Sequence, residues 1–113
     1  LSNLNELEQV LTNLLLNAKD AAHQVSHERK VEVKTVSDKH AAGFIVTDNG
    51  VGIPKENLSK IFDPFFTTKD VGKGTGLGLA VTQSIVQKFD GHIKVASEVG
   101  KGTTFTVIFP RVA

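Results

Sequence analysis

Two amides and a carboxylate lie along one side of the first predicted helix, where their oxygen atoms could bind a ligand. Hydrophobic periodicity predicts this helix from about residue 4 to 25. At about 100° per residue, Asn13, Asn17 and Asp20 form one narrow stripe. Apolar residues on nearly the opposite side predict the buried face: Leu7, Leu11, Leu14, Ala18 and Ala22. Amides compete for backbone hydrogen bonds in a helix, so their presence here needs an explanation. Because the apolar residues Val10 and Leu16 flank them, we expect Asn13 and Asn17 to face a lined cavity. Plain exposure, or capping of a nearby loop, is the alternative.

A second carboxylate, Asp48, ends a strand-like run and begins the segment DNGVGI at 48–53. Asp-Asn-Gly after a strand is typical of a hairpin turn. The residues from Val51 to Lys55 do not resume the alternation of a strand, which makes a simple hairpin a poor fit. A hairpin turn is the alternative interpretation, and the pattern favours another role for this turn.

Glycines alternate immediately before the second predicted helix, in the segment GKGTGLGL at 72–79. Backbone N–H groups at the N-terminus of a helix suit a phosphate group, so this layout predicts contact with phosphate. A P-loop is excluded because Lys73 is followed by Gly74, where Ser or Thr is required. A flexible linker is the alternative, although Leu77 and Leu79 would be unusual in one.

The order of predicted elements places these motifs in one mixed domain. After the first helix, the pattern predicts strands at 31–36 and 43–47, a long loop from about 50 to 76 with a helical turn after Pro54, a helix at 77–89 ended by Asp90 and Gly91, and a closing hairpin of strands at 92–97 and 104–109. The repeated βαβ rhythm of a parallel sheet is missing. We therefore expect an α/β (α+β) fold in the form of a two-layer sandwich.

Composition narrows the class of protein further. The chain has 113 residues and a formal net charge of +1, which predicts a single domain over 1–113 with no basic surface for nucleic acid. It has no Cys, which excludes disulfides and thiolate metal sites and fits a reducing compartment. No apolar run is long enough to span a membrane, so we expect no direct membrane contact. The lack of Met predicts a fragment of a longer protein.

Four motifs in fixed order resemble those of one known family: NLLLNA at 13–18, DNGVGI at 48–53, FDPFF at 62–66 and GKGTGLGL at 72–79. Together they resemble the ATP-binding catalytic domain of sensor histidine kinases, in the GHKL class, over nearly the whole chain. The resemblance implies a Bergerat-type fold, with helices on one face of a mixed, mostly antiparallel sheet. It also implies that ATP lies between two helices under a flexible lid, here at about 51–76, in a cytoplasmic domain.

The resemblance also implies roles for individual residues. Asn17 matches the asparagine that binds Mg²⁺ through its amide oxygen. Asp48 matches the carboxylate that accepts a hydrogen bond from the exocyclic amine of adenine, with Thr103 assisting it, and Gly50 and Gly52 would let the backbone pass close to the base. The expected catalytic residues are Asn13 and Asn17, and the expected ATP-binding residues are Asn13, Asn17, Asp20, Asp48, Gly50, Gly52, Ile53, Lys69, Gly74, Thr75, Gly76, Leu77, Gly78, Leu79 and Thr103.

The amide at Asn13 favours phosphoryl transfer over hydrolysis. Hydrolytic relatives such as DNA gyrase carry a water-activating glutamate one turn before the metal asparagine, and an amide cannot act as that base. The resemblance therefore implies a protein-histidine kinase. It would transfer the γ-phosphoryl of ATP to a histidine on the dimerisation and phosphoacceptor domain of the parent protein, with a response regulator as an indirect partner. A GHKL ATPase, an anti-sigma-type serine kinase and a non-catalytic nucleotide-sensing module are the alternatives.

Two further groups of residues are given structural roles. Phe62, Phe65 and Phe66 are expected to anchor the core, and a docking surface for the phosphoacceptor helices is the alternative. His27, which Glu28 follows, is expected to be an ordinary loop residue because a strand begins shortly after it.

Overall fold

The computed structural model describes residues 4–23, 28, 30–63 and 78–110. Its elements are helix α1 (Leu4–His23), strands β1 (Val31–Ser37) and β2 (Ala41–Asp48), the 3-10 turn η1 (Lys55–Asn57), helix α2 (Gly78–Lys88), and strands β3 (His92–Glu98) and β4 (Gly102–Pro110). The strands extend up to two residues beyond their predicted ends, and η1 confirms the helical turn expected after Pro54. The predicted elements are therefore confirmed wherever they fall within the described residues.

The four strands form one sheet in the order β1-β2-β4-β3. All three pairings between these described strands are antiparallel. The β1–β2 and β3–β4 hairpins are joined by the pairing of β2 with β4, which brings Val46 opposite Phe105 and Asp48 opposite Thr103. The predicted mostly antiparallel sheet is confirmed, and the pairing at its centre brings together residues that lie 55 positions apart in the sequence (103 − 48).

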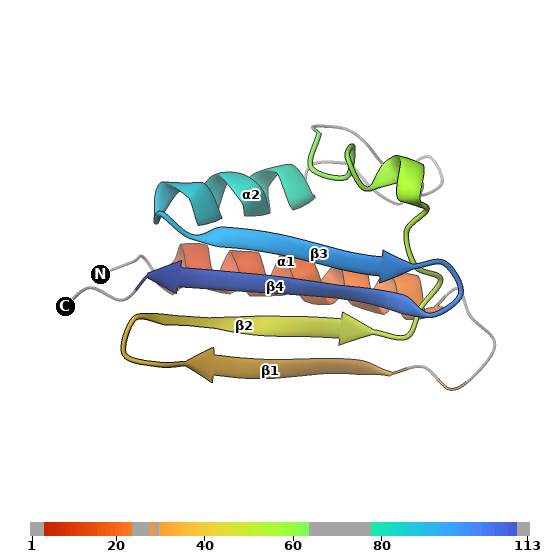
Figure 1. Cartoon of the computed structure of the whole chain (residues 1–113), viewed down its shortest axis with the longest axis horizontal. Helices are drawn as coiled ribbons and strands as arrows, with labels where there is room; N and C mark the ends of the chain where they lie inside the picture. Colours follow the sequence, from red (N-terminus) through yellow and green to blue (C-terminus); the bar gives the residue numbers. More distant parts are fainter. Residues whose placement is uncertain (1–3, 24–27, 29, 64–77, 111–113) are drawn as a thin grey trace.

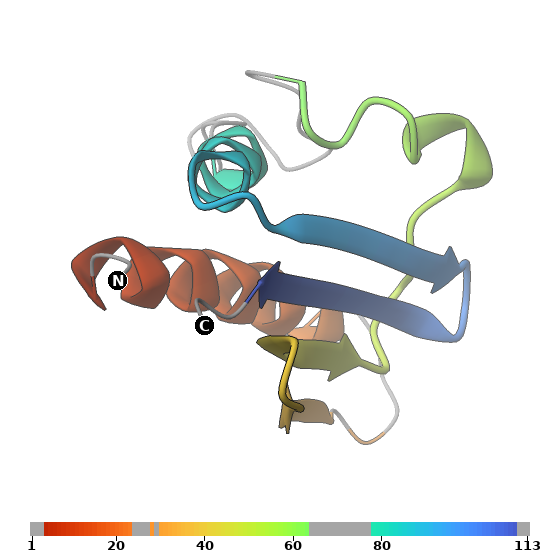
Figure 2. The ribbon, with the colours of Figure 1, turned by 60° about the vertical axis from the view of Figure 1, so that its left-hand side comes forward.

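Both helices lie on one face of the sheet (Figures 1 and 2). Helix α1 contacts β1, β2 and β4, whereas α2 contacts β3 and packs beside α1. The core between the two layers consists of apolar side chains from both helices, the inner side of β2 and β4, and Ile61: Val10, Leu14, Ala18, Val46, Ile61, Ile85, Val86, Phe105 and Val107. This arrangement confirms the two-layer sandwich.

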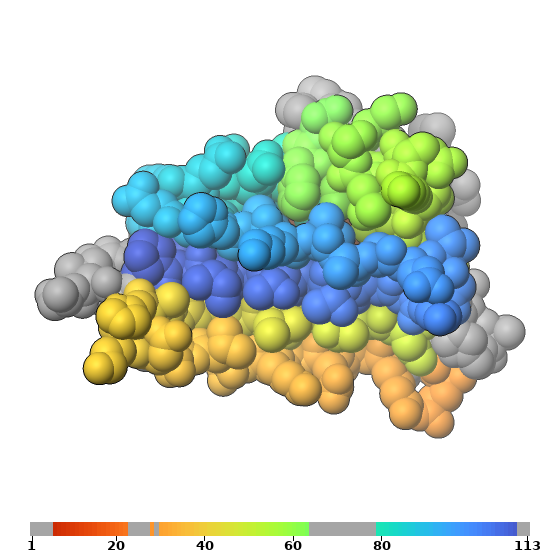
Figure 3. Space-filling model, viewed as in Figure 1, coloured from red at the N-terminus to blue at the C-terminus, as the bar shows by residue number. Residues whose placement is uncertain are grey.

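The other face of the sheet carries no helix in the described part of the chain (Figure 3). One row across it runs from Lys34 through Ile45 and Thr106 to Lys94. The hydroxyl oxygens of Thr47 and Thr104 lie 3.3 Å apart in the neighbouring row. Threonines and lysines are typical of a strand face in contact with water, so the functional residues are expected on the helix-covered face.

Two contacts fix the way in which α1 and α2 pack against each other. The ammonium of Lys88 lies 2.9 Å from a carboxylate oxygen of Glu6, and the amide of Asn13 donates a 3.2 Å hydrogen bond to the hydroxyl of Thr82. The contacts advance along α1 while they move back along α2, so the helices are antiparallel (Figure 1). One turn beyond Asn13, residue Asn17 is therefore placed level with Gly78, the first residue of α2.

Candidate functional site

Asp48 is a buried carboxylate at the carboxyl end of β2, with only 6% of its surface exposed. One carboxylate oxygen accepts a 2.8 Å hydrogen bond from the backbone N–H of Gly50. Burial raises the pKa of Asp48, and hydrogen bonds from the backbone N–H groups of Gly50 and Thr103 lower it by a smaller amount. A carboxylate that is kept from water but retains free lone pairs is suited to accept a hydrogen bond from a ligand.

Two glycines beside Asp48 are required by the packing of the protein itself. A Cβ atom at Gly50 would collide with the backbone of Ala21 near the end of α1. Gly52 has a φ of 79°, and a Cβ there would collide with the carbonyl oxygen of Glu98. The sequence reading expected these glycines to admit a nucleotide base. Close approach to α1 and to the β3–β4 hairpin accounts for both of them without a ligand.

The first residues of the predicted lid are anchored to the sheet and to α1. The backbone N–H of Val51 donates to the carbonyl of Ala21 at 3.3 Å, and the carbonyl of Val51 accepts from the N–H of Gly100 at 2.9 Å. The N–H of Ile53 donates to the hydroxyl of Ser97 at 2.7 Å. The segment 51–53 thus holds a fixed place beside Asp48, and the predicted lid from 64 onward lies outside the described residues.

Sequence reasoning missed Ser97, which links three parts of this site. Its hydroxyl accepts from the N–H of Ile53, donates to the carbonyl of Gly102 at 3.0 Å, and lies 2.8 Å from the hydroxyl of Thr103. The signal was present in the alternation of β3, in which Ile93 and Val95 face the core and Ser97 takes the next inward position. A polar residue in such a position needs buried partners.

The amide stripe of α1 runs along the edge of the buried face. The helical wheel had placed it nearly opposite that face, and this prediction was wrong. Asn13, Asn17 and Asp20 are all half-buried. The two apolar residues that flank the stripe differ sharply in exposure: Val10 is fully buried, whereas Leu16 is 52% exposed. The docking of α2 beside α1 widens the buried face toward the stripe, which a wheel of α1 alone does not reveal.

The contact between Asn13 and Thr82 should contribute to stability. Thr82 is fully buried and accepts the hydrogen bond of Asn13 across the helix pair. Thr82→Val keeps the shape of the side chain but removes its oxygen, and we expect a loss of about 0.5–1.5 kcal/mol in the free energy of unfolding. Urea unfolding followed by circular dichroism measures this, with Thr82→Ser as the control that keeps the hydroxyl. An unchanged free energy for Thr82→Val would show that this hydrogen bond does not stabilise the helix pair.

The remaining candidates fall into two groups. Gly78 begins α2, and Leu79 is half-buried against the core. Five predicted ATP-binding residues lie outside the described residues: Lys69, Gly74, Thr75, Gly76 and Leu77. Their predicted contacts stay predictions.

The packing of Phe62 tests its expected role as a core anchor. The ring of Phe62 meets that of Phe105 edge to face, with centroids 6.5 Å apart. This confirms the core-anchoring role for Phe62. Phe65, Phe66 and His27 lie outside the described residues.

The described candidates gather along one stretch of α1. Gly50 touches the backbone of Ala21, one residue after Asp20, so the turn that carries Asp48 lies against the last turns of α1. Asn17, one turn earlier, is level with the N-terminus of α2. The arrangement therefore offers a buried acceptor at one end and a helix N-terminus with an amide oxygen at the other. Such a site suits a ligand with a hydrogen-bond donor at one end and negative charge at the other.

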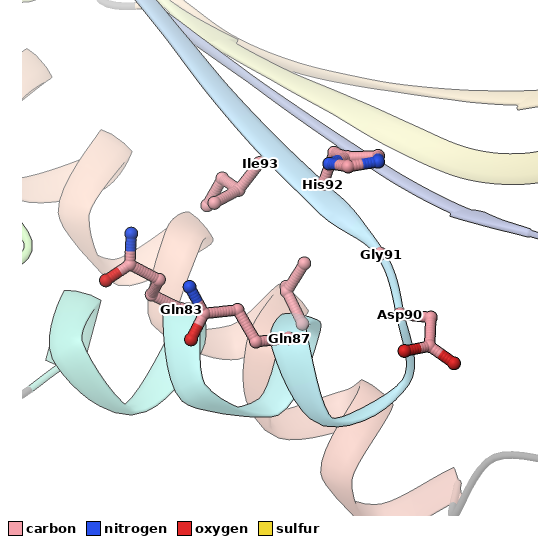
Figure 4. Close-up of a pocket in the computed structure, with 7 residues that line it drawn as sticks. Gln83, Gln87, Asp90, Gly91, His92 and Ile93 are labelled. Atoms are coloured by element: carbon pink, nitrogen blue, oxygen red, sulfur yellow. The ribbon is translucent and has the colours of Figure 1, made fainter.

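A groove elsewhere on the protein does not belong to this site. It has a volume of about 440 Å³ and lies between the second half of α2 and the start of β3, lined by Gln83, Val86, Gln87, Asp90, Gly91, His92 and Ile93. Figure 4 shows that the labelled polar side chains do not converge on one point. This groove is at the opposite end of α2 from Gly78.

The described part of the chain contains neither a metal-binding cluster of His, Cys, Asp or Glu side chains nor a membrane-spanning helix. No group of three or more His, Cys, Asp or Glu side chains there could hold a metal ion. Neither described helix is long and apolar enough to cross a membrane.

Known histidine kinases contain a region that is similar to this chain. It is 42% identical to the sensor kinase CckA of Brucella abortus over 98% of the chain and 13% of that protein, and 49% identical to the sensor histidine kinase ZraS of Escherichia coli over 94% of the chain and 22% of that protein. The chain thus spans less than a quarter of either relative. The nucleotide-free catalytic domain of the histidine kinase ThkA superposes with a TM-score of 0.81 at 32% identity, covering 96% of this chain and 69% of that one. A family model described as histidine kinase-, DNA gyrase B- and HSP90-like ATPase matches residues 2–113, and the chain belongs to this family.

Proposed function

We propose that this domain binds Mg-ATP along α1 and passes the γ-phosphoryl group to a histidine on another domain of its parent protein. Binding of ATP follows from membership of an ATPase family. The observation that carries the finer proposal is the placement of the Asp48 turn and the N-terminus of α2 along the same stretch of α1. This placement would supply contacts for both the adenine end and the phosphate end of one nucleotide.

Adenine would be read at Asp48. An ionised carboxylate only accepts hydrogen bonds, so it pairs with the exocyclic amine of adenine and opposes the carbonyl oxygen that guanine carries in that place. Thr103 lies opposite Asp48 in the β2–β4 register and is itself buried. As a second polar residue next to Asp48, Thr103 would help the site to distinguish purines by their substituents.

The triphosphate would lie at the N-terminus of α2, where free backbone N–H groups and the helix dipole favour negative charge. Asn17 is half-buried and level with this end of α2, so its amide oxygen would hold Mg²⁺ that is shared with the phosphates. A single neutral ligand fits Mg²⁺, which keeps several waters and binds through few protein oxygens when phosphates supply the others. The ion would neutralise phosphate charge during transfer.

Transfer is favoured over hydrolysis by the surroundings of Asn13. Its amide nitrogen donates to Thr82, so the side chain has a structural role between the helices. An amide has no basic site with which to activate water. A histidine on the dimerisation and phosphoacceptor domain of the parent protein is itself a nucleophile, so the kinase site needs positioning and charge stabilisation more than it needs a base. A response regulator would then be an indirect partner, and the reaction would take place in the cytoplasm.

Calorimetric titration with ATP and with GTP in the presence of magnesium tests the proposed orientation of the nucleotide. ATP should bind more tightly, because the carbonyl oxygen of guanine would face the carboxylate of Asp48 without a proton between them. Equal affinities for the two nucleotides would overturn the assignment of Asp48 to adenine.

Asp48 should also make binding and stability respond to pH in opposite directions. Burial raises its pKa, so the folded protein holds this proton more tightly than the unfolded chain does. Its contribution to stability is therefore fully present below the ordinary Asp pKa and is lost as pH rises through the raised pKa. ATP affinity should change the other way, because only the ionised form accepts from adenine. Both trends should be measured as differences from Asp48→Asn, which cancels the titration of the phosphates; a difference that does not vary with pH would contradict them.

A further inference from the structure

Ser97 holds Thr103 and the backbone of Ile53 together at the inner side of the β3–β4 hairpin. The hydroxyl of Ser97 is within hydrogen-bond distance of three groups: the N–H of Ile53 at 2.7 Å, the carbonyl of Gly102 at 3.0 Å and the hydroxyl of Thr103 at 2.8 Å. Thr103 is 5% exposed. These bonds decide which way each hydroxyl proton points.

A serine hydroxyl has one proton to donate and two lone pairs that accept. The N–H of Ile53 can only donate, so it occupies one lone pair of Ser97. The carbonyl of Gly102 can only accept, so it takes the single proton of Ser97. The hydroxyl of Thr103 must then donate its own proton to the second lone pair of Ser97, because two facing lone pairs at 2.8 Å would repel. All the hydrogen-bonding capacity of Ser97 is thereby used.

Thr103 is left with lone pairs only, and it lies directly across the β2–β4 register from Asp48. Asp48 in its ionised form also offers lone pairs only. Both side chains of this part of the site are then acceptors, and neither can supply a proton to a ligand atom that itself accepts.

We infer that Ser97 is a positioning residue for nucleotide selection: it fixes the Thr103 hydroxyl as a hydrogen-bond acceptor, so that the site favours a purine with an amine at the 6-position over one with a carbonyl oxygen. This inference rests on the proposed nucleotide function. Ser97 acts through Thr103 and need not touch the ligand. If Ser97 is removed, the proton of Thr103 is free to turn toward a ligand oxygen, and discrimination weakens.

The test is the ratio of dissociation constants for inosine triphosphate and ATP, measured with magnesium by calorimetry. Ser97→Ala should reduce this ratio by about tenfold, the change expected when one unpaired acceptor contact is relieved. Ser97→Thr keeps the hydroxyl and should keep the wild-type ratio. If Ser97 were only a structural support, its loss would lower the affinity for both nucleotides equally and leave the ratio unchanged. That result would overturn the inference.

Thr103→Val supplies the matched control, because it removes the hydroxyl that Ser97 is inferred to orient. In that background, Ser97→Ala should produce no further change in the ratio; an undiminished change would show that Ser97 acts by another route and would overturn the inference. Failure of the proposed adenine assignment looks different, because the wild-type protein would then bind ATP and inosine triphosphate with equal affinity.

A measurement on the unmodified protein keeps the inference testable if Ser97→Ala does not fold. In the nucleotide-free protein, the hydroxyl proton of Thr103 should exchange slowly with water and give a nuclear Overhauser effect to the β protons of Ser97. Rapid exchange, or a proton directed away from Ser97, would contradict the orientation on which the inference depends.

Discussion

Asp48→Asn should lower the affinity for ATP by about 10- to 150-fold, which corresponds to about 1.5–3 kcal/mol for a hydrogen bond to a charged group. The N–H of Gly50 donates to one oxygen of Asp48 and would hold the amide oxygen of an asparagine in the same place. The amide nitrogen would then take the position of the other carboxylate oxygen. This amide nitrogen, a hydrogen-bond donor, would face the amine of adenine, which is also a donor. The carbonyl oxygen that guanine carries in that place would instead accept a hydrogen bond from it.

The nucleotide preference should therefore fall or reverse in Asp48→Asn, which calorimetry with ATP and GTP measures. Asp90→Asn is the matched control, since it makes the same chemical change at an exposed position beyond the far end of α2 and should leave both affinities unchanged. The variant protein without nucleotide should be at least as stable as the wild type, because a buried charge is removed. Wild-type affinity for ATP in a folded Asp48→Asn protein would contradict the role given to this carboxylate.

Asn17→Ala should reduce phosphoryl transfer on the order of 100-fold or more, the scale observed when one preorganised group that stabilises charge is removed. The expected cause is loss of the amide oxygen that would hold Mg²⁺ against the triphosphate at the start of α2. Affinity for ATP should consequently lose most of its dependence on magnesium. Both quantities are measured by titration of the metal at fixed ATP, in the binding assay and in the transfer assay.

The fold should survive this substitution. Asn17 is half-buried at the edge of the core, and alanine is a better helix former than asparagine, so the melting temperature should be equal or slightly higher. Gln9→Ala is the matched control, because it removes an exposed amide from the same helix. If Asn17→Ala keeps the magnesium dependence and the transfer rate of the wild type, the metal ligand is a different residue.

The elements were predictable because their signals are local. The helical spacing of Leu14 and Ala18 and the alternation of 92–97 are visible in short windows of sequence, and the structure confirms both elements. The failure of strand alternation after Gly50 also marked the turn at Asp48 correctly. The turn approaches the end of α1 instead of closing a hairpin.

Contacts between distant segments could not be predicted in the same way. The bond from Asn13 to Thr82 depends on how α2 docks beside α1, and no pattern within either helix encodes that contact. The glycines of the Asp48 turn were expected to admit a base, but backbone packing is enough to explain them, and that packing becomes visible only when α1 and the β3–β4 hairpin are in place. Ser97 was missed for the same reason, because its partners come from three separate segments.

Phosphoryl transfer to histidine is the decisive test of the proposed kinase activity. The domain should be mixed with the phosphoacceptor domain of its own parent protein, magnesium and ATP labelled in the γ-phosphate. We expect an acid-labile, alkali-stable phosphohistidine on the acceptor domain, and little release of free phosphate when the acceptor is left out. Substantial ATP turnover by the isolated domain, unaffected by Asn13→Ala and with no labelled acceptor, would contradict the kinase assignment and favour a hydrolytic ATPase.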